Sequence, residues 1–539
     1  MHPCTQSYEP LTTMNSSRRK LLQRSAGALA AAGLSLHLRA EAKVMPPRFH
    51  PTDVAANYKC IFNHELLVIA GKKDNSPAYI GSFIDKLKDT DVDAVMCCPT
   101  MWRTNLYPSE IDPQWKKYTP QQHSPKFPSY DRMMGYIHGG GDPVKETLES
   151  CRRNGKDFFI SYRMNDHHYV SDLTWPTHNA IWREHPEYWL GDSDASVGKA
   201  GDNVRLFNYL IPEVRDYYFS ILHELCTNYD VDGVELDFQR FPKFFRSADL
   251  DAGRSVMTAF LRRIKTMMDD ISHERGKSLK LCIRIPETMA KCEAAGLDIP
   301  EWDKQRMVEM INVSSFYTHT IELGVEGFRA ATSYGKIYGE LNYLTYQQAG
   351  SAKGFGRRYT TVETYRASAL NLFHRGVDGL SLFNYDYVPA DQRIAMAEGL
   401  KRITDIEFLR SVSKDYVISV GFGTFPAKDE KTLELIIPDD TTKVRFDHAV
   451  LRVETKSNCT DLHIGVWLNG VALEPLAHEG TELFAPVAKN FAYPAAEVLK
   501  FYTVPLNRII AGKNTVKISK LGPAKPSCQL RSMELALYR

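Results

Sequence analysis

The segment with the clearest chemical potential is residues 231–242, which read VDGVELDFQRFP. In a β-strand the side chains alternate, so Glu235 and Asp237 share one face while the apolar residues at 234, 236 and 238 share the other. If the apolar face packs against helices, both carboxyl groups point into the mouth of a barrel. Charge there is costly unless it is used or neutralised. The pattern therefore predicts acid and base chemistry, with a buried ion pair to Arg240 or Arg284 as the alternative.

The surrounding chain provides the elements that would position this segment. From about residue 58 to residue 387, short apolar runs alternate with amphipathic helical stretches, a pattern typical of parallel βα units. Eight such units close a (β/α)8 barrel, in which long loops after the strands build the active site. The predicted strands are 59–62, 92–98, 158–163, 233–238, 279–285, 310–316, 336–342 and 379–385, and the predicted helices are 80–87, 143–153, 214–229, 253–270, 302–308 and 364–375.

The run from Asp232 to Pro242 resembles the fourth-strand motif of barrel glycoside hydrolases, especially family 10 of the glycosyl-hydrolase-like proteins. Family 18 chitinases have a related run, Asp-Gly-x-Asp-x-Asp-x-Glu, but Gln239 stands here at the position of the catalytic Glu. This difference argues against a chitinase mechanism. In amylase-like barrels the fourth-strand Asp is the nucleophile, a resemblance that selects Asp237. The resemblance covers the barrel only and implies cleavage of a glycosidic bond.

Glycoside cleavage needs a second acid, because one carboxyl group protonates the leaving oxygen while the other attacks or activates water. Glu340, in the predicted seventh strand, is the first choice, since many retaining barrel enzymes place their acids on strands four and seven. Its alternative role is an ion pair with Lys336 or Arg358. Glu287 is the main rival as second acid, and Asp386 is a weaker one.

Further polar and aromatic residues follow the predicted strands and are candidates for binding substrate. Three arginines on neighbouring strands could keep the carboxyl groups ionised or clamp an anionic sugar such as a uronate or sulfated glycan. Trp102 could stack on a sugar ring, with Trp175 and Trp182 as alternatives. We predict Asp237 and Glu340 as the essential pair, with Glu235 tuning them. The predicted substrate-binding residues are Trp102, Arg163, Asn165, Asp166, His167, Arg240, Arg284, Glu287, Tyr317, Asn384, Tyr385 and Asp386.

Near residue 409 the pattern changes to strands alone. The predicted strands are 433–437, 449–453, 462–468, 498–504, 515–518 and 533–538, separated by turn dipeptides such as Asn469-Gly470 and Ala511-Gly512. This pattern predicts a β-sandwich that resembles the jelly-roll modules of many glycosidases. Because the sequence shows no exposed aromatic row, we expect the sandwich to brace the barrel rather than bind glycan.

The first 42 residues are expected to be an export signal. Residues 17–22, SRRKLL, resemble the twin-arginine motif, an apolar run follows at 26–38, and Ala40-Glu41-Ala42 has the form of a cleavage site. An ordinary N-terminal helix is the alternative. We therefore expect a signal at 1–42, a barrel at 43–408 and a sandwich at 409–539, in a protein exported to the periplasm or the extracellular space.

The composition limits the partners that we expect. Lys and Arg total 67 against 65 Asp and Glu, and the net charge of +2 gives no reason to propose nucleic acid or an anionic membrane. No stretch after the leader has the roughly 18 apolar residues that span a bilayer. The chain has no CxxC pair and no HExxH motif, so we expect no metal and no cofactor.

The reading that we favour is a glycoside hydrolase acting on an oligosaccharide or polysaccharide. The first rival is a carbohydrate-binding barrel without catalysis, as Gln239 permits. A less favoured rival is a metal-dependent hydrolase that uses Glu235, Asp237 and His167, because the predicted first strand runs into Phe62-Asn63-His64-Glu65 and lacks the usual His-x-His.

Overall fold

The computed structural model describes most of the chain beyond residue 56. The described residues are 57–70, 76–119, 127–191, 203–315, 319–351, 354–387, 397–419, 425–427, 430–455, 463–477, 483–484, 499–521 and 528–539. Residues 49–539 form one compact unit. The predicted export signal and its cleavage site lie outside the described residues. Among the described helices, none is long and apolar enough to cross a membrane.

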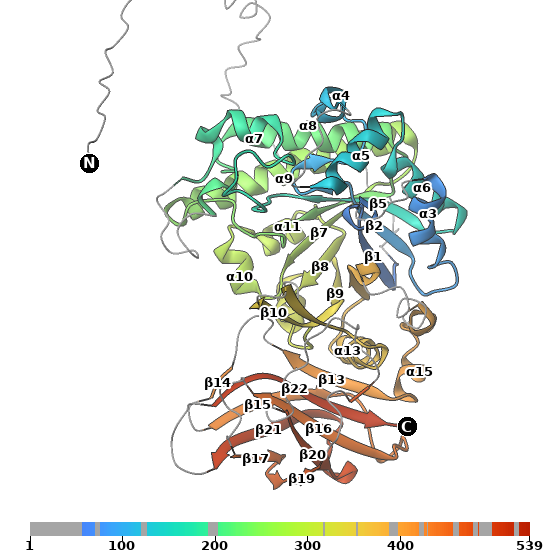
Figure 1. Cartoon of the computed structure of the whole chain (residues 1–539), viewed down its shortest axis with the longest axis vertical. Helices are drawn as coiled ribbons and strands as arrows, with labels where there is room; N and C mark the ends of the chain where they lie inside the picture. Colours follow the sequence, from blue (N-terminus) through green and yellow to red (C-terminus); the bar gives the residue numbers. More distant parts are fainter. Residues whose placement is uncertain are drawn as a thin grey trace, which may run out of the picture. The chain divides into compact units, whose positions relative to one another are not determined.

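Eight parallel strands close into a barrel, which confirms the predicted fold (Figure 1). All eight predicted strands are present, and the seventh has the predicted bounds. The order around the barrel is β1-β12-β9-β8-β7-β6-β5-β2. The strands are β1 Cys60–Glu65, β2 Ala94–Cys98, β5 Asp157–Arg163, β6 Gly233–Asp237, β7 Lys280–Pro286, β8 Met310–Ser314, β9 Lys336–Asn342 and β12 Gly379–Phe383.

Helices follow most barrel strands, and capping side chains mark the starts of several of them. Asp142 accepts a hydrogen bond from the Lys145 N–H (3.0 Å), and Thr361 caps the helix before β12 in the same way. The α-helices are α2 Leu67–Ala70, α3 Pro77–Asp85, α4 Gln114–Lys117, α5 Pro128–His138, α6 Pro143–Arg153, α7 Ala180–Glu184, α8 Pro212–Asn228, α9 Leu250–Arg275, α10 Met289–Ala294, α11 Ile299–Lys304, α12 Val325–Ala331, α13 Val362–His374 and α15 Ile406–Arg410. Short 3₁₀ turns are η1 Pro186–Tyr188, η2 Asn203–Arg205, η3 Ser247–Asp249, η4 Tyr385–Tyr387 and η7 Leu506–Arg508.

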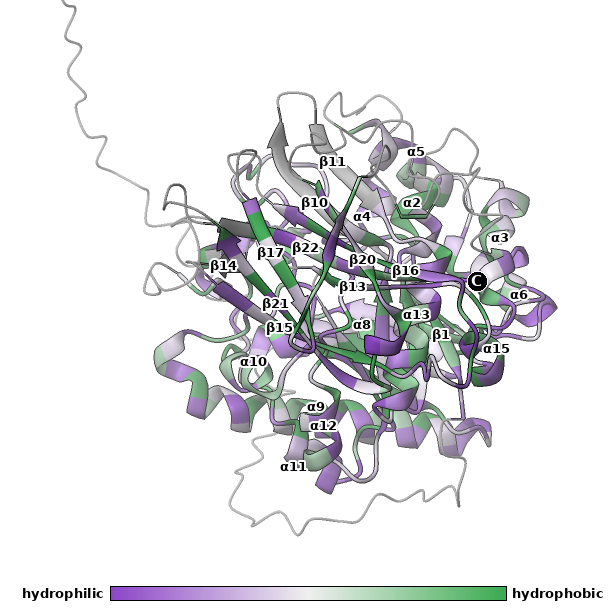
Figure 2. Cartoon of the chain, turned by 90° about the horizontal axis from the view of Figure 1, so that it is seen from below, coloured by the Kyte–Doolittle hydropathy of each residue, from purple (hydrophilic) through white to green (hydrophobic). Residues whose placement is uncertain are grey.

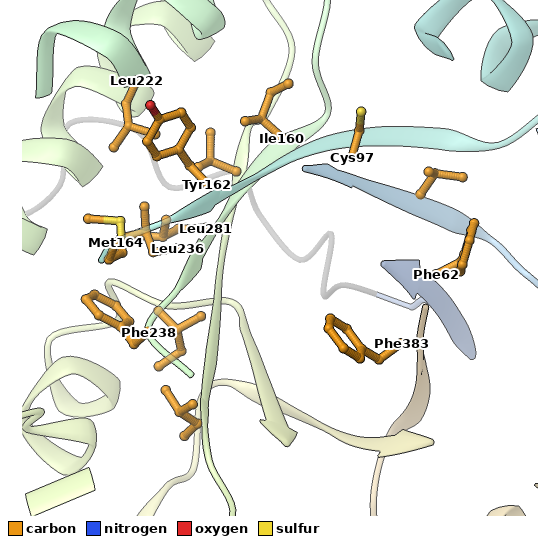
Figure 3. Packing of buried hydrophobic residues seen from close by; sticks show 14 of the residues in the cluster. Phe62, Cys97, Ile160, Tyr162, Met164, Leu222, Leu236, Phe238, Leu281 and Phe383 are labelled. Atoms are coloured by element: carbon orange, nitrogen blue, oxygen red, sulfur yellow. The ribbon is translucent and has the colours of Figure 1, made fainter. Parts of the chain in front are cut away.

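The outward faces of the barrel strands form the main hydrophobic core with the helices. Leu236 and Phe238 pack there together with Ile160 and Leu222, as Figure 3 shows. The alternation read from the sequence is therefore confirmed: these apolar residues face the helices, and their neighbours on the same strand face the barrel interior.

The barrel interior is apolar at its N-terminal end. Gly233 has no room for a side chain, because an added Cβ would lie 2.4 Å from the Phe159 ring and 2.2 Å from the Lys280 carbonyl oxygen. The interior becomes polar one layer further along the strands. The apolar layer consists of Ile61, Ala94, Met96, Phe159, Cys282, Met310 and Tyr338.

The C-terminal part of the chain forms two antiparallel sheets around a second core, which confirms the predicted β-sandwich. One sheet has the order β13-β22-β16-β20-β19, with β14 pairing β22, and the other has the order β15-β21-β17-β18. Hydrophobic and hydrophilic residues alternate along β17 and β21 (Figure 2). The strands are β13 Lys414–Ser419, β14 Phe425–Ala427, β15 Glu430–Ile437, β16 His448–Thr455, β17 His463–Leu468, β18 Val471–Ala472, β19 Glu474–Leu476, β20 Leu499–Val504, β21 Gly512–Leu521 and β22 Cys528–Tyr538.

Two hairpins accompany the barrel strands and were not predicted. They pair β3 Thr100–Met101 with β4 Thr104–Asn105, and β10 Leu344–Ser351 with β11 Gly354–Tyr359. Hydrogen bonds also join barrel helices to sandwich strands: the Asn371 side chain of α13 donates to the Ile436 carbonyl (2.7 Å), and the Thr364 hydroxyl donates to Asp415 (3.3 Å). These contacts are those expected of a sandwich that braces the barrel.

Candidate active site in the barrel

Glu235 occupies the polar layer in the middle of the barrel. Its carboxyl group accepts hydrogen bonds from the side chains of Asn63 (2.9 Å), Ser161 (2.6 Å) and Asn312 (3.1 Å), which come from three different strands. Burial raises the pKa of Glu235, and the nearby charge of Asp237 raises it further. The group therefore holds its proton more strongly than an exposed glutamate does, which fits a residue that tunes its neighbours.

One layer closer to the C-terminal ends of the strands, the guanidinium group of Arg284 joins two carboxyl groups. Its Nη1 lies 3.1 Å from both oxygens of Asp237. Its Nε lies 2.6 Å and its Nη2 3.1 Å from the two oxygens of Glu340, while Nη2 also donates to Ser314 (2.9 Å). Sequence analysis left open an ion pair with Arg240 or Arg284, and the structure selects Arg284.

The two carboxyl groups on Arg284 have different surroundings. Asp237 also accepts hydrogen bonds from the backbone N–H groups of Gln239 and Arg240, both at 3.1 Å, so the turn after β6 fixes its position. Burial raises the pKa of Glu340, and this effect exceeds the lowering by Arg284 and by the Ser314 hydroxyl. Two acids with unequal environments are the arrangement that acid and base catalysis needs.

A second charged cluster lies at the ends of β1 and β5. Arg163 bonds Glu65 and, at 3.2 Å, Asp166, while the Tyr387 hydroxyl donates to Glu65 (3.0 Å). Burial alone would raise the pKa of Glu65, but the charges of Arg163 and Arg240 lower it to about 2. Sequence reasoning missed Glu65. Its position two residues after Asn63, on the same inward face of β1, was the available signal.

His168 connects this cluster to Arg240. Its Nδ1 lies 2.8 Å from Asp166 and its Nε2 lies 3.2 Å from Nη2 of Arg240. A guanidinium group can only donate, so Nε2 accepts and the proton resides on Nδ1. Burial lowers the pKa of His168 to about 4 although Asp166 raises it, and the ring is neutral at pH 7. The neighbouring His167, the predicted binding residue, instead places its ring against Phe241 at 3.5 Å.

Aromatic rings gather beside the charged clusters. Trp102 lies 4.7 Å from both Phe127 and Tyr169, and Tyr169 stacks on Trp175 at 3.9 Å with the planes 4° apart. Tyr169 is 41% exposed. Trp102, Tyr169 and Phe241 all have φ between 56° and 63°, a left-handed conformation that is strained in residues with large side chains. Such strain is concentrated at functional sites.

Several predicted binding residues lie away from the carboxyl groups. Asn165 donates to the carbonyls of Phe207 (3.0 Å) and Lys243 (2.9 Å), so it braces two loops instead of lining the mouth. Glu287 pairs with Lys291, four residues further along the chain, and is not joined to Arg284 by any ion pair between described residues. Trp182 is fully buried, which removes it as a stacking surface.

Tyr385 and Asp386, which follow β12, also lie away from the position expected of substrate-binding residues. The Tyr385 ring is buried against Phe62, and Asp386 bonds Nδ1 of His64 at 2.6 Å. His64 points outward to helix α3, where it contacts Phe83. The physical reason is that β12 ends at Phe383, so strand alternation does not apply to the 3₁₀ turn that follows. Asn384 lies at this turn with φ 54°, and Tyr317 lies outside the described residues.

The layer that contains Asp237 and Glu340 is deeply buried. Asp237 is 3% and Glu340 is 1% exposed. Because so little of either side chain is exposed, a ligand contacts these carboxyl groups only when neighbouring side chains shift. Within the described ranges, no set of three or more His, Cys, Asp or Glu side chains is placed to hold a metal ion.

Residues 75–252, which include the fourth-strand motif, match the family Glycosyl hydrolase-like 10. This match confirms the resemblance expected from the sequence. Residues 75–252, about a third of the chain, are therefore similar to the glycosyl-hydrolase-like proteins. No curated protein matches the chain.

Solved structures of glycan-active enzymes are similar to the chain at low identity. A cycloisomaltooligosaccharide glucanotransferase from Paenibacillus sp. is 10% identical with a TM-score of 0.34, over 89% of this chain and 58% of that chain. A family 18 N-acetylglucosaminidase from Paenibacillus barengoltzii is 12% identical with a TM-score of 0.38, over 64% and 99%. Alpha-L-fucosidase isoenzyme 2 from Paenibacillus thiaminolyticus is 14% identical with a TM-score of 0.42, over 66% and 51%.

Proposed function

We propose that the barrel hydrolyses a glycosidic bond in an oligosaccharide or polysaccharide, with Asp237 and Glu340 as the essential pair. The observation that carries this proposal is the convergence of both carboxyl groups on Arg284 at the C-terminal ends of β6 and β9. Active sites of (β/α)8 barrels lie at this face. Two carboxyl groups with separate roles are the minimum that glycoside cleavage requires.

The surroundings assign different roles to the two acids. Glu340 is the proton donor to the leaving oxygen, because burial raises its pKa. Asp237 acts as nucleophile or as base toward water, because Arg284 and two backbone N–H groups hold its carboxyl group in a fixed position at the end of β6. Arg284 positions both groups. Glu235 lies one layer below the pair, where the charge of Asp237 raises its pKa.

The aromatic rings beside the charged clusters provide the surface that a sugar chain would contact. Phe127, Tyr169 and Trp175 are partly exposed around the buried Trp102, and Tyr169 is the most exposed of them. The apolar faces of sugar rings stack on such surfaces. Binding energy gained there can help to displace the groups that cover Asp237.

The test is a screen of polysaccharides for reducing ends released by the purified mature chain. Asp237→Asn and Glu340→Gln should each lower turnover by at least about a hundredfold, the scale of a lost acid or base. Glu224→Gln is the matched control, because Glu224 is also buried but bonds Tyr107 and Ser109 away from the pair. If both site variants kept most of the turnover, the assignment would be wrong.

A second candidate function is glycan binding without catalysis. Two observations favour it: Gln239 stands where the chitinase-like run has its Glu, and Arg284 neutralises charge on both acids. This candidate predicts that a glycan affinity gel retains the chain while no substrate of the screen yields reducing ends. It also predicts that Asp237→Asn leaves retention unchanged.

We also propose export through the twin-arginine pathway to the periplasm or the extracellular space. The support is the run SRRKLL at 17–22 and the A-x-A sequence at 40–42. Lys substitution of Arg18 and Arg19 should keep the unprocessed chain in the cytoplasm. Export of that variant at the normal level would contradict the proposal.

A further inference from the structure

Two side-chain amides flank the Asp237–Glu340 pair, and their orientations are fixed by their partners. Nε2 of Gln239 donates to the Ser314 carbonyl (2.9 Å), and Nδ2 of Asn342 donates to the Ser315 carbonyl (3.1 Å). Carbonyl oxygens only accept hydrogen bonds, so these amide nitrogens cannot be exchanged with the amide oxygens. The oxygens of both amides therefore point away from Ser314 and Ser315.

These two amide oxygens are buried acceptors without a hydrogen-bond partner among the described residues. Asn342 lies two residues after Glu340 on the same face of β9 and also donates to it (3.3 Å). Gln239 lies two residues after Asp237 and donates its backbone N–H to that carboxyl group. A buried acceptor is costly when it is unpaired. The site thus offers acceptors to a ligand that brings N–H or O–H donors.

The charged groups around Arg284 also favour a ligand that brings hydrogen-bond donors. Three carboxyl groups, those of Glu235, Asp237 and Glu340, act on this single guanidinium group. Arg284 already bonds two of them, so it has no hydrogen-bonding edge left for an anionic ligand. The described part of this layer therefore contains three carboxyl groups and one guanidinium group.

The other two arginines at the mouth are also engaged. Arg163 bonds Glu65 and Asp166, and Arg240 bonds His168 and acts on Glu65. At Arg163, an incoming carboxylate or sulfate would have to compete with the carboxylates of Glu65 and Asp166. The anionic substrate that the sequence suggested is therefore disfavoured.

We propose that the sugar unit bound between Asp237 and Glu340 is an amino sugar with a free, protonated amine. The proposal rests on the proposed function and names its substrate class. An ammonium group supplies up to three donors for the oxygens of Gln239 and Asn342, and its positive charge would lie beside the carboxyl groups that Arg284 binds. A hydroxyl group supplies a donor without charge, and a uronate adds further acceptors and negative charge.

The test compares three probes on the full mature chain by titration calorimetry at pH 6: the methyl glycosides of glucosamine, glucose and glucuronic acid. The glucosaminide should bind at least about tenfold more tightly than the glucoside, because charge-assisted hydrogen bonds are stronger than neutral ones. The glucuronide should bind most weakly. Raising the pH to 9 should abolish the advantage of the amine. Equal affinities, tighter binding of the glucuronide, or no binding of the glucosaminide would overturn the proposal.

Variants keep the test specific to the two amides. Gln239→Met and Asn342→Leu should each reduce the preference for glucosaminide over glucoside by about tenfold. Asn371→Leu is the matched control, because Asn371 is equally buried but donates to the Ile436 carbonyl from α13. An unchanged preference in both site variants, with folding verified by circular dichroism, would overturn the role of the amides.

The same reagents separate this inference from the proposed hydrolysis. If reducing ends were released from neutral or uronic polymers only, the proposed hydrolysis would be supported and the amino-sugar inference would be overturned. If the chain bound the glucosaminide selectively but cleaved no glucosamine polymer, the amino-sugar inference would be supported and the proposed hydrolysis would be rejected.

Discussion

Replacing Glu65 with Gln removes the negative charge that Arg163 binds at the end of β1 while keeping the shape of the side chain. The change leaves the Arg163 guanidinium buried with one carboxylate partner fewer. Tyr387 can still donate to the amide oxygen, so the effect on stability comes from charge and not from lost packing. The folded state should be destabilised for this reason.

The magnitude follows from the pKa of Glu65, which the surrounding charges lower from 4.5 to about 2. One pKa unit corresponds to 1.36 kcal/mol, so the ionised side chain contributes about 3 kcal/mol to the free energy of unfolding. Because the folded pKa is lowered, this contribution is present in full above pH 4.5 and is lost as the pH falls toward 2. The variant should therefore be about 3 kcal/mol less stable at pH 7 and equal to the wild type near pH 2.

Urea unfolding, followed by tryptophan fluorescence from pH 2.5 to pH 7, measures this difference. Glu110→Gln is the matched control, since the Glu110 side chain is 64% exposed and pairs with Lys116 at the surface. The control should change stability by less than about 0.5 kcal/mol at any pH. A loss in Glu65→Gln that stays constant across the pH range would refute the electrostatic reasoning.

Three further predictions concern the barrel interior. Arg284→Met should lower the free energy of unfolding by about 3–5 kcal/mol, because it leaves two buried carboxyl groups without their cationic partner. In a double-mutant cycle, adding Glu340→Gln should recover part of this loss. Additive losses in denaturant unfolding would contradict the coupling. Burial raises the pKa of Glu235 in the folded state above 4.5, so its ionisation destabilises the fold as the pH rises through that pKa. Glu235→Gln should therefore gain stability relative to the wild type between pH 4 and pH 7. A difference in the free energy of unfolding that stays constant over this range would argue against this. Gly233→Ala should lower the free energy of unfolding by about 1–3 kcal/mol or more, because the added methyl group overpacks the interior. Gly327→Ala should be neutral or stabilising, because the nearest atom lies 3.7 Å from the added Cβ. Equal melting temperatures of the two variants would be inconsistent with the crowding at Gly233.

The sequence by itself determined the elements and the faces of the strands. The bounds 336–342 were predicted for β9 and observed there, and the inward direction of Glu235 and Asp237 followed from alternation with apolar residues. These features are local, because a period of 2 or 3.6 residues is set by backbone geometry and by which side must be buried. The β10–β11 hairpin was missed because its strands, LTYQQAGS and GFGRRY, are mostly polar or glycine and show no sustained apolar alternation.

Only the tertiary structure decided which polar groups meet. Asn63 bonds Glu235 across 172 residues of sequence, and Glu65 joins Arg163 across 98. Arg284 bridges Asp237 and Glu340 because barrel closure brings β6, β7 and β9 around one interior. The position of each partner depends on strand order and register, which no local pattern encodes. For the same reason, the sequence showed three arginines near the mouth without showing that protein carboxylates already bind Arg163 and Arg284.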